Sequence, residues 1–596
     1  MSEKNIPLGG EFLLIPGDSE HCFVPEEFSE EHRMIYKTSI DFIQGEIWPN
    51  DAKIEKKDHE VVKKLMAEAG ELGLLGTDIP EEFGGLGLDK ASTALVTEAF
   101  GTAGSIAVAQ GAHTGIGTMP IVIYGTKEQK EKYLPDSASG QNIHGFCLTE
   151  SGAGSDAIGG CRTKAVLSDD GKHYIINGSK QWITNGGWAS VFIVFAKVDE
   201  QFTAFIVERD TPGLTAEAEE EKMGIKGSST TTVIFEDVKV PVENLLGEIG
   251  KGHFAAMNPL SIGRYKLGAA AIGGSKLALG QATKYAAERA QFGKNIIEYG
   301  AIREKMARMA MKCYMGESVI FRNVGLLQDA LHDIDPTAED YAERCTEVIR
   351  EYAIECAISK VHGSEVLDYC VDEFVQILGG YGYVAEYPAE RAYRDARINR
   401  IFEGTNEVNR LLIPGEILKK TMKGKLPFMA AGQKLMGEIM EYSPLMVEIG
   451  DEPLAYQEHM VEMCKKAVIF VAGTAMQKLM QKLSNEQEVL MRCADMIIEI
   501  FAMEAGVIRA KKAIAAKGEE KAQFHLDVVK AYMDEMIPQI DQWAKECLSF
   551  IEEGDDLRTL LVGIRKLLKY TPENGISLRK AIADRVVEKG GYPLDY

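Results

Sequence analysis

The segment IFEGTNEVNR, residues 401–410, holds a carboxylate in a setting that suits a general base. Glu403 follows the apolar residues Ile401 and Phe402 and precedes Gly404. Apolar surroundings raise the pKa of a glutamate above its ordinary value of about 4.3, and a base that works near neutral pH needs such a shift. Taken alone, the segment also fits an exposed glutamate at a turn, so its interpretation depends on the rest of the chain.

Two further segments could form the walls of a cofactor site. Residues 152–157 (GAGSDA) match the dinucleotide-binding pattern G-x-G-x-x-A, but no helical pattern follows them, as that fold requires. They therefore indicate a loop whose N–H groups could face an anion. In KQWITNGG, residues 180–187, Trp182 fits either the core of a sandwich or an aromatic plate for a flat cofactor, with Thr184 as a hydrogen-bonding neighbour.

ERAQFGK, residues 288–294, and QILGGYGY, residues 376–383, are weaker signals. By themselves they are typical of a solvated helix end and of a helix C-cap with its turn.

Composition disfavours several kinds of partner and predicts where the protein is located. The 596-residue chain has a formal net charge of -24, which disfavours nucleic acids and anionic membranes. Its ten cysteines form no CxxC pair and no zinc-like cluster with histidine, so we predict no metal site. Residues 1–10 lack a secretory signal, and the longest apolar run noted, Ala467–Met476, is about half of a membrane span. A cytoplasmic location follows, with at most weak membrane-surface contact through the Lys-rich residues 419–425.

The elements that position these segments alternate between helical and β-rich regions. Helical periodicity dominates residues 26–141, for example in residues 58–74, and returns in residues 253–414 with stretches long enough for a four-helix bundle. Pro414-Gly415 indicates a boundary, and amphipathic helices fill residues 426–596. The intervening region, residues 142–252, has short β-branched and aromatic runs between turn signals, which predict an antiparallel sandwich or barrel. The predicted strands are residues 173–178, 190–198, 202–208 and 231–240.

Together, in this order and spacing, the motifs resemble the acyl-CoA dehydrogenase family over about residues 26–414. The matching blocks are CLTESGAGSD (147–156), KQWITNG (180–186), GIKGSSTTTVIFEDVKVPVENLLGE (224–248), ERAQFGK, QILGGYGY and IFEGTNEVNR. The additional C-terminal helices are most similar to the very-long-chain branch. The resemblance implies a mainly α protein with an N-terminal α domain, a middle antiparallel β domain, a C-terminal four-helix α domain and an extra helical domain. FAD would lie where the domains and a second subunit meet.

The resemblance also implies roles for individual residues. Glu403 would be the catalytic base, because the alternative position used by some branches, just before Arg264, is Gly263 here. The residues expected to bind FAD are Thr149, Ser155, Trp182, Thr184, Arg289, Phe292, Gln376, Gly380, Thr405 and Glu407. The residues expected to contact the substrate are Ser155, Arg264, Phe402, Gly404 and Gly111, with Gly111 and Ala112 leaving room for a long acyl chain.

The implied activity is α,β-dehydrogenation of a fatty acyl-CoA to a trans-2-enoyl-CoA, the first step of β-oxidation. Electrons would pass to an electron-transferring flavoprotein, and the protein would be a homodimer. Two alternatives share the fold: an acyl-CoA oxidase that uses oxygen, and a non-catalytic assembly protein. Retention of Glu403, Trp182 and the Gly-rich loop argues against the second alternative.

Overall fold

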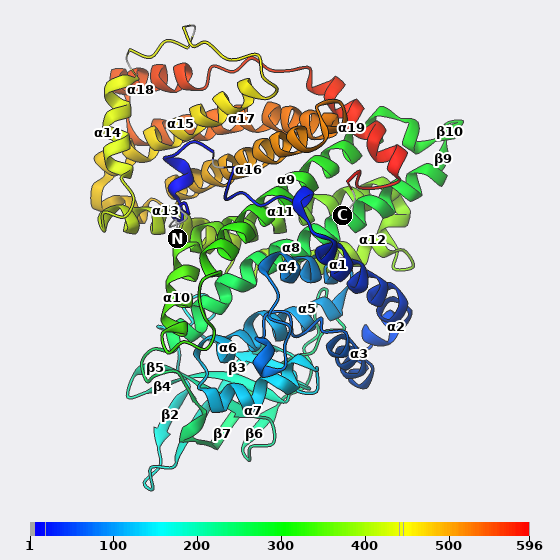
Figure 1. Cartoon of the computed structure of the whole chain (residues 1–596), viewed down its shortest axis with the longest axis vertical. Coiled ribbons are helices and arrows are strands. Elements are labelled where there is room, and N and C mark those ends of the chain that lie inside the picture. The colour runs from blue at the N-terminus through cyan, green and yellow to red at the C-terminus, as the bar shows by residue number, and fades with distance from the viewer. Residues whose placement is uncertain (1–5, 18, 440, 445, 595–596) are drawn as a thin grey trace.

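A bundle of long helices forms the middle of the molecule, with the β-sheet on one side and the additional helical domain on the other (Figure 1). The computed structural model describes residues 6–17, 19–439, 441–444 and 446–594. Residues 1–5, part of the segment in which no secretory signal is predicted, lie outside this range. The predicted order of helices, sheet, helices and further helices is confirmed.

The N-terminal domain is helical, as predicted. Asp58 caps the helix expected in residues 58–74, since its side chain accepts a hydrogen bond from the Val61 N–H. One stretch of the described residues, Ser105–Tyr124, is long and apolar enough on average to cross a membrane. The search for an uninterrupted apolar run missed it, because polar residues such as Gln110 and His113 interrupt the stretch. It is 72% buried inside the protein, as expected of a core element. The helices are α1 Glu30–Phe42, α2 Trp48–Ile54, α3 His59–Glu71, α4 Lys90–Phe100, α5 Ser105–Gly111, α6 Met119–Tyr124 and α7 Lys127–Ala138.

The middle domain contains a sheet in the order β6-β7-β3-β2-β4-β5-β8, with β1 paired to β4. Its pairs are antiparallel except β1 with β4 and a single contact of β2 with β4. Alternate residues of β4 point to opposite faces, and both faces are covered, which explains its unbroken apolar sequence. The strands are β1 His144–Cys147, β2 Lys164–Leu167, β3 His173–Thr184, β4 Val191–Val198, β5 Gln201–Glu208, β6 Leu214–Ala216, β7 Thr230–Pro241 and β8 Leu245–Leu246.

Glycines allow the two central helices of the third domain, α8 and α11, to pack closely. A Cβ atom on Gly268 would lie 2.6 Å from the Ser359 carbonyl oxygen, and one on Gly363 would lie 2.8 Å from the Gly268 Cα. This approach lets Arg264 of α8 and Lys360 of α11 both reach the backbone of residues 403 and 404. The helices are α8 Gly252–Glu288, α9 Gly300–Leu331, α10 Tyr341–Glu351, α11 Ala353–Leu378, α12 Pro388–Ala396 and α13 Asn406–Met422. A short hairpin, β9 Ala290–Gln291 with β10 Lys294–Asn295, follows α8.

Pro414-Gly415 does not end a helix, because both residues lie inside α13. Packing of α13 against α11 and α16 outweighs the local preference of proline. Lys420 is buried, and its ammonium group donates to the carbonyl oxygens of Gly9 and Glu351 and to the Glu351 carboxylate. The basic segment proposed for membrane contact is therefore smaller than its sequence suggests, and that contact stays a prediction.

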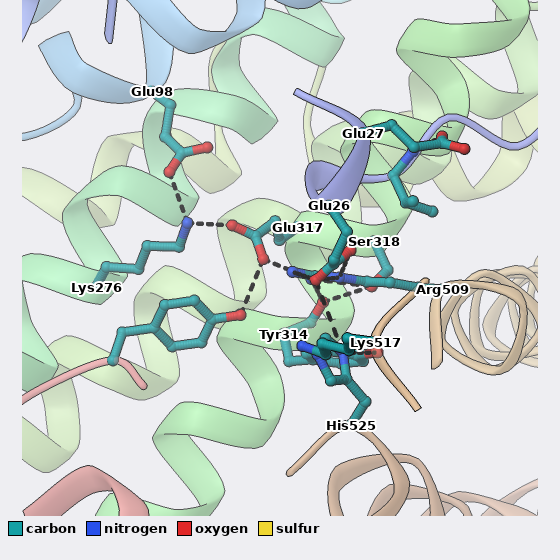
Figure 2. A network of polar contacts seen from close by, with 12 residues as sticks. Glu26, Glu27, Glu98, Lys276, Tyr314, Glu317, Ser318, Arg509, Lys517 and His525 are labelled. Atoms are coloured by element: carbon teal, nitrogen blue, oxygen red, sulfur yellow. Dashed lines mark hydrogen bonds and ion pairs between the residues drawn. The ribbon is translucent and has the colours of Figure 1, made fainter. Parts of the chain in front are cut away.

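The additional domain is a set of helices, and a buried ionic network connects it to the four-helix domain (Figure 2). Arg509 of α16 is fully buried and contacts Glu317 of α9 at 2.5 Å and Glu26, before α1, at 2.9 Å. Glu317 also pairs with Lys276 and accepts a hydrogen bond from the Tyr592 hydroxyl. The helices are α14 Phe428–Glu438, α15 Ala455–Leu479, α16 Gln487–Lys517, α17 Gln523–Ile551, α18 Gly554–Leu567 and α19 Gly575–Lys589.

Candidate active site

Glu403 lies in a short left-handed stretch of backbone just before α13. Its φ is 58° and that of Gly404 is 80°, a conformation that costs energy for a residue with a side chain. Three side chains, Asn409, Arg264 and Lys360, hold this backbone in place. The Asn409 amide donates to the carbonyl oxygens of Glu403 at 3.3 Å and Gly404 at 2.8 Å, and the Arg264 Nε donates to that of Glu403 at 3.2 Å. The carboxylate is thereby directed away from the chain and into a cavity.

The Glu403 carboxylate lies in surroundings that suit a base. Its Oε2 atom is buried and has no hydrogen-bond partner among the described residues. Burial raises the pKa of Glu403 to about 7, while the nearby charges of Arg264 and Lys360 act in the opposite direction. Burial also lowers the pKa of Lys360 to about 7. A carboxyl group with this pKa is ionised in part at neutral pH and can both take and release a proton.

The cavity beside Glu403 has a volume of about 420 Å³. Much of its wall is apolar and made of small residues from α5 and α8. A charged cluster also reaches the wall, where Arg391 pairs with Asp51, Glu55 and Asp395. The predicted site residues in the lining are Gly111, Thr184, Phe402 and Glu403, together with Ala112 and Gly263. Space of this size and character fits a flexible apolar chain beside a flat ring.

Gly263 adjoins the base directly. A Cβ atom on this residue would lie 3.2 Å from the Glu403 Oε2 atom. The alternative position for a base, considered from the sequence, therefore faces the same point of the cavity as Glu403. With glycine at position 263, the cavity holds a single carboxylate there, supplied by residue 403.

Trp182 lies at a bulge of β3 and is not a core residue, so that alternative is wrong. The pairing of β3 with β7 shifts between Lys180 and Ile183, and Trp182 has a φ of 58°. Such a bulge turns a side chain away from its regular direction, and 57% of Trp182 is exposed. Thr184, at the end of the same strand, lines the cavity.

A buried ion pair that the sequence did not reveal joins the two predicted flavin-binding segments. The Lys180 ammonium contacts the Glu150 carboxylate at 2.7 Å and the Leu148 carbonyl oxygen at 3.2 Å, and the Gln181 N–H donates to the Thr149 carbonyl oxygen. The pair fixes Thr149 beside the strand that bears Trp182. Lysine and glutamate are too common in sequences for this pairing to be recognised without the fold.

The Gly-rich loop after β1 is not part of a Rossmann unit. A turn with a bridge between Glu150 and Ala153 follows the strand, and the next regular element is β2. Gly152 and Gly154 have no neighbouring atom within 4 Å of a Cβ position, so a ligand could approach their backbone. Ser155, in the same loop, is exposed.

Four predicted residues lie away from the cavity on an exposed surface. Phe292, in the β9–β10 hairpin, is 93% exposed, and the Arg289 guanidinium lies 5.4 Å from the centre of the Tyr381 ring. Gln376 and Gly380 are exposed at the end of α11. This chain does not bring them to Glu403, so their predicted contacts with FAD require a second subunit and stay predictions.

The other predicted residues surround the start of α13. The Thr405 hydroxyl caps the helix by accepting a hydrogen bond from the Val408 N–H, and Glu407 is exposed in the first turn. Arg264 is buried beneath the Glu403 backbone, so its predicted contact with CoA stays a prediction. Lys360 and Asn409 were missed for different reasons. Lys360 is far from Glu403 in the sequence, and Asn409 lies in the same segment but looks like an ordinary polar residue of a helix.

A cleft between helical and β domains, with one base and an exposed aromatic plate, defines an enzyme that acts on an apolar substrate beside a flat cofactor. The chain belongs to the acyl-CoA dehydrogenase family. Models of the family's N-terminal, middle and C-terminal domains match residues 29–141, 145–238 and 250–418, and a further C-terminal domain model matches residues 463–566.

Individual relatives agree with this assignment. The chain is 48% identical to a probable acyl-CoA dehydrogenase of Bacillus subtilis, over 99% of both chains. It is 37% identical to the bovine (Bos taurus) mitochondrial very long-chain specific acyl-CoA dehydrogenase, over 91% of this chain and 81% of that one. The crystal structure of an acyl-CoA dehydrogenase complexed with FAD from Bacillus anthracis superposes with a TM-score of 0.96, at 49% identity, over 98% of this chain and 100% of that one.

FAD is the cofactor of this family, and the site fits it. The open backbone at Gly152 and Gly154 can approach a phosphate, Trp182 offers a flat exposed surface, and Thr184 adds a hydroxyl at the cavity wall. The protein is therefore an FAD-dependent oxidoreductase.

Proposed function

We propose that this protein dehydrogenates long-chain fatty acyl-CoA thioesters between Cα and Cβ, with Glu403 as the base, and passes the electrons to an electron-transferring flavoprotein. The observation that carries this proposal is the Glu403 Oε2 atom, which lies at the wall of a largely apolar cavity that Thr184 also lines and has no hydrogen-bond partner in the described part of the chain. FAD, when bound beside Thr149, Trp182 and Thr184, supplies the acceptor for the hydride from Cβ.

The residues of the chain supply the proton chemistry. Glu403 Oε2 has no competing donor among the described residues, so it is available to take the α-proton. The bound acyl chain would exclude water and strengthen the carboxylate as a base. Arg264 and Lys360 hold the Glu403–Gly404 backbone through hydrogen bonds to its carbonyl oxygens. The base is thus fixed before the substrate binds, which lowers the entropy cost of the step.

A long acyl chain is favoured by the size of the cavity and by its lining of small residues. Gly111 lies on this wall in helical conformation, with no atom within 4 Å of its Cβ position. Leucine can therefore be placed there without backbone strain, and its side chain would occupy cavity space.

Gly111→Leu is expected to lower kcat/KM for a long-chain acyl-CoA by about 10- to 200-fold relative to a short-chain one, as a few misplaced methylene groups do in an apolar pocket. Initial rates with acyl-CoAs of increasing length measure the effect. Gly415→Leu, in α13 with equally open surroundings, is the control. An equal loss at all chain lengths would contradict the assignment of this wall to the acyl chain.

The rate of substrate oxidation is expected to rise with pH through a midpoint of about 7, because only ionised Glu403 can take the proton. Removing the positive charge in Lys360→Met should move the midpoint to higher pH, since this charge and that of Arg264 stabilise the carboxylate. Rapid-reaction measurements of kcat/KM between about pH 5.5 and 8.5 test this. A profile that does not change between these limits would exclude Glu403 as the titrating group.

The acceptor and the oligomeric state are part of the same proposal. The 57% exposure of Trp182 supports access of a protein acceptor to the edge of the cofactor site, and the 93% exposure of Phe292 supports a dimer in which it is covered. Reoxidation of the reduced enzyme by electron-transferring flavoprotein, compared with air, separates a dehydrogenase from an oxidase. Sedimentation measurements decide between a dimer and a larger assembly.

A further inference from the structure

Helix α13 connects the proposed base to the additional C-terminal domain. It begins at Asn406, three residues after Glu403, and packs against α11 of the four-helix domain and α16 of the additional domain. The left-handed backbone at Glu403 persists only when its surroundings hold it. Contacts that fix the start of α13 therefore also fix the base.

Lys360 and Asn406 form the part of these contacts nearest to the base. The buried Lys360 ammonium donates to the Gly404 carbonyl oxygen at 2.8 Å and to the Asn406 Oδ1 atom at 2.7 Å. Asn406, also buried, donates from Nδ2 to the Glu365 Oε1 atom at 3.0 Å. The backbone is thus held directly after Glu403 and again at the first residue of the helix.

Arg410 extends the contacts to the additional domain. Its guanidinium donates two hydrogen bonds to the Glu365 carboxylate, at 2.7 and 2.9 Å. Its Nε atom donates a third to the Asp495 Oδ1 atom at 2.6 Å. A bidentate pair of this kind fixes direction as well as distance. Asp495 is buried on α16 and receives a second contact from Arg492 at 3.2 Å. We name the Asp495 relay by its members: Asp495, Arg410, Glu365, Asn406 and Lys360.

We propose that Asp495 is a positioning residue for the reaction. Through the Asp495 relay it helps to hold the backbone of residues 403 and 404, which carries the proposed base. The additional domain then supports the active site instead of only packing on the core. The inference rests on the proposed role of Glu403. Its structural part, that the relay holds the segment containing Glu403 in a fixed conformation, is measured independently of activity.

Asp495→Asn keeps the shape of the side chain and removes the charge that Arg410 needs. In the holoenzyme it is expected to lower kcat by about 5- to 20-fold, with KM for acyl-CoA changed by less than about twofold, in the range of couplings carried through packed networks. Amide hydrogens of residues 403–412 should exchange about tenfold faster, because the contacts that hold them are weakened. Asp495→Glu should restore both properties.

Controls separate positioning from general destabilisation. Glu458→Gln removes a carboxylate of α15 that pairs at 2.6 Å with Lys511 of α16, the helix that carries Asp495. This pair does not belong to the relay, so the variant should change neither property. Arg410→Lys breaks the same link from α13, because lysine cannot form the bidentate pair. It should reproduce the Asp495→Asn effects, and the double variant should be no slower than the slower single variant.

Two outcomes would overturn the proposal. One is wild-type kcat and exchange in both Asp495→Asn and Arg410→Lys. The other is faster exchange over the whole additional domain without preference for residues 403–412. If the exchange effect is found but Glu403→Gln remains active, the relay stands and the assignment of the base fails.

Discussion

Glu403→Gln is expected to lower the rate of acyl-CoA oxidation by roughly 10³–10⁴-fold, the contribution of a well-placed general base at the upper end of its range. Glutamine keeps the volume of the side chain but cannot take the α-proton at neutral pH. The nearby Arg264 and Lys360 would still hold the backbone, since both bond to carbonyl oxygens of residues 403 and 404. Acyl-CoA binding should therefore persist while oxidation is lost.

The measurement is single-turnover reduction of the bound flavin by acyl-CoA, with binding followed separately by titration. Glu416→Gln, farther along α13 in an ion pair with Lys419, is the matched control and should react at the wild-type rate. Near wild-type reduction in Glu403→Gln would refute the assignment. Loss of acyl-CoA binding instead would show that the carboxylate serves binding and not proton transfer.

Arg509→Met is expected to lower the free energy of unfolding by about 3–5 kcal/mol, the cost of leaving a buried ion pair without one partner. Arg509 is fully buried between the carboxylates of Glu26 and Glu317 (Figure 2). Methionine fills much of the volume but leaves the negative charges without the cation between them. The loss is electrostatic, and it should be larger than a change in packing alone would produce.

Urea unfolding followed by tryptophan fluorescence and by circular dichroism measures this effect. Lys511→Met on the same helix removes a half-exposed partner of Glu458 and should cost less than about 1 kcal/mol. Equal stability of Arg509→Met and the native protein would mean that the desolvation cost of the network cancels its attraction.

The alternation of helical and β-rich patterns predicted the order of the domains, whereas the base was chosen through the family resemblance. The segment around Glu403 alone also fitted an exposed turn, and the empty position at Gly263 had meaning only beside the related sequences. The structure places Gly263 against Glu403. The strands of the middle domain were visible because turn residues separate short apolar runs. Whether the base acts in catalysis is a question for the variant described above.

The parts that could not be predicted depend on contacts between distant segments. Arg264 and Lys360 meet beneath Glu403 only because glycines bring α8 and α11 together. The exposure of Trp182 depends on a register shift between two strands, which no short window of sequence contains. Pro414 was misleading for a related reason, since packing on both α11 and α16 keeps the helix intact around it.

The members of the buried ionic network are synthesised at widely separated times. Glu26 and Arg509 are 483 residues apart, so Arg509 is added to the chain on the order of a minute after Glu26. Tyr592, which bonds to Glu317, is synthesised later still. Domains generally fold as units during synthesis, so the carboxylates of Glu26 and Glu317 precede the cation that completes their network. During this interval the nascent chain is partly folded and its ionic network is incomplete, so it is exposed to chaperones and proteases.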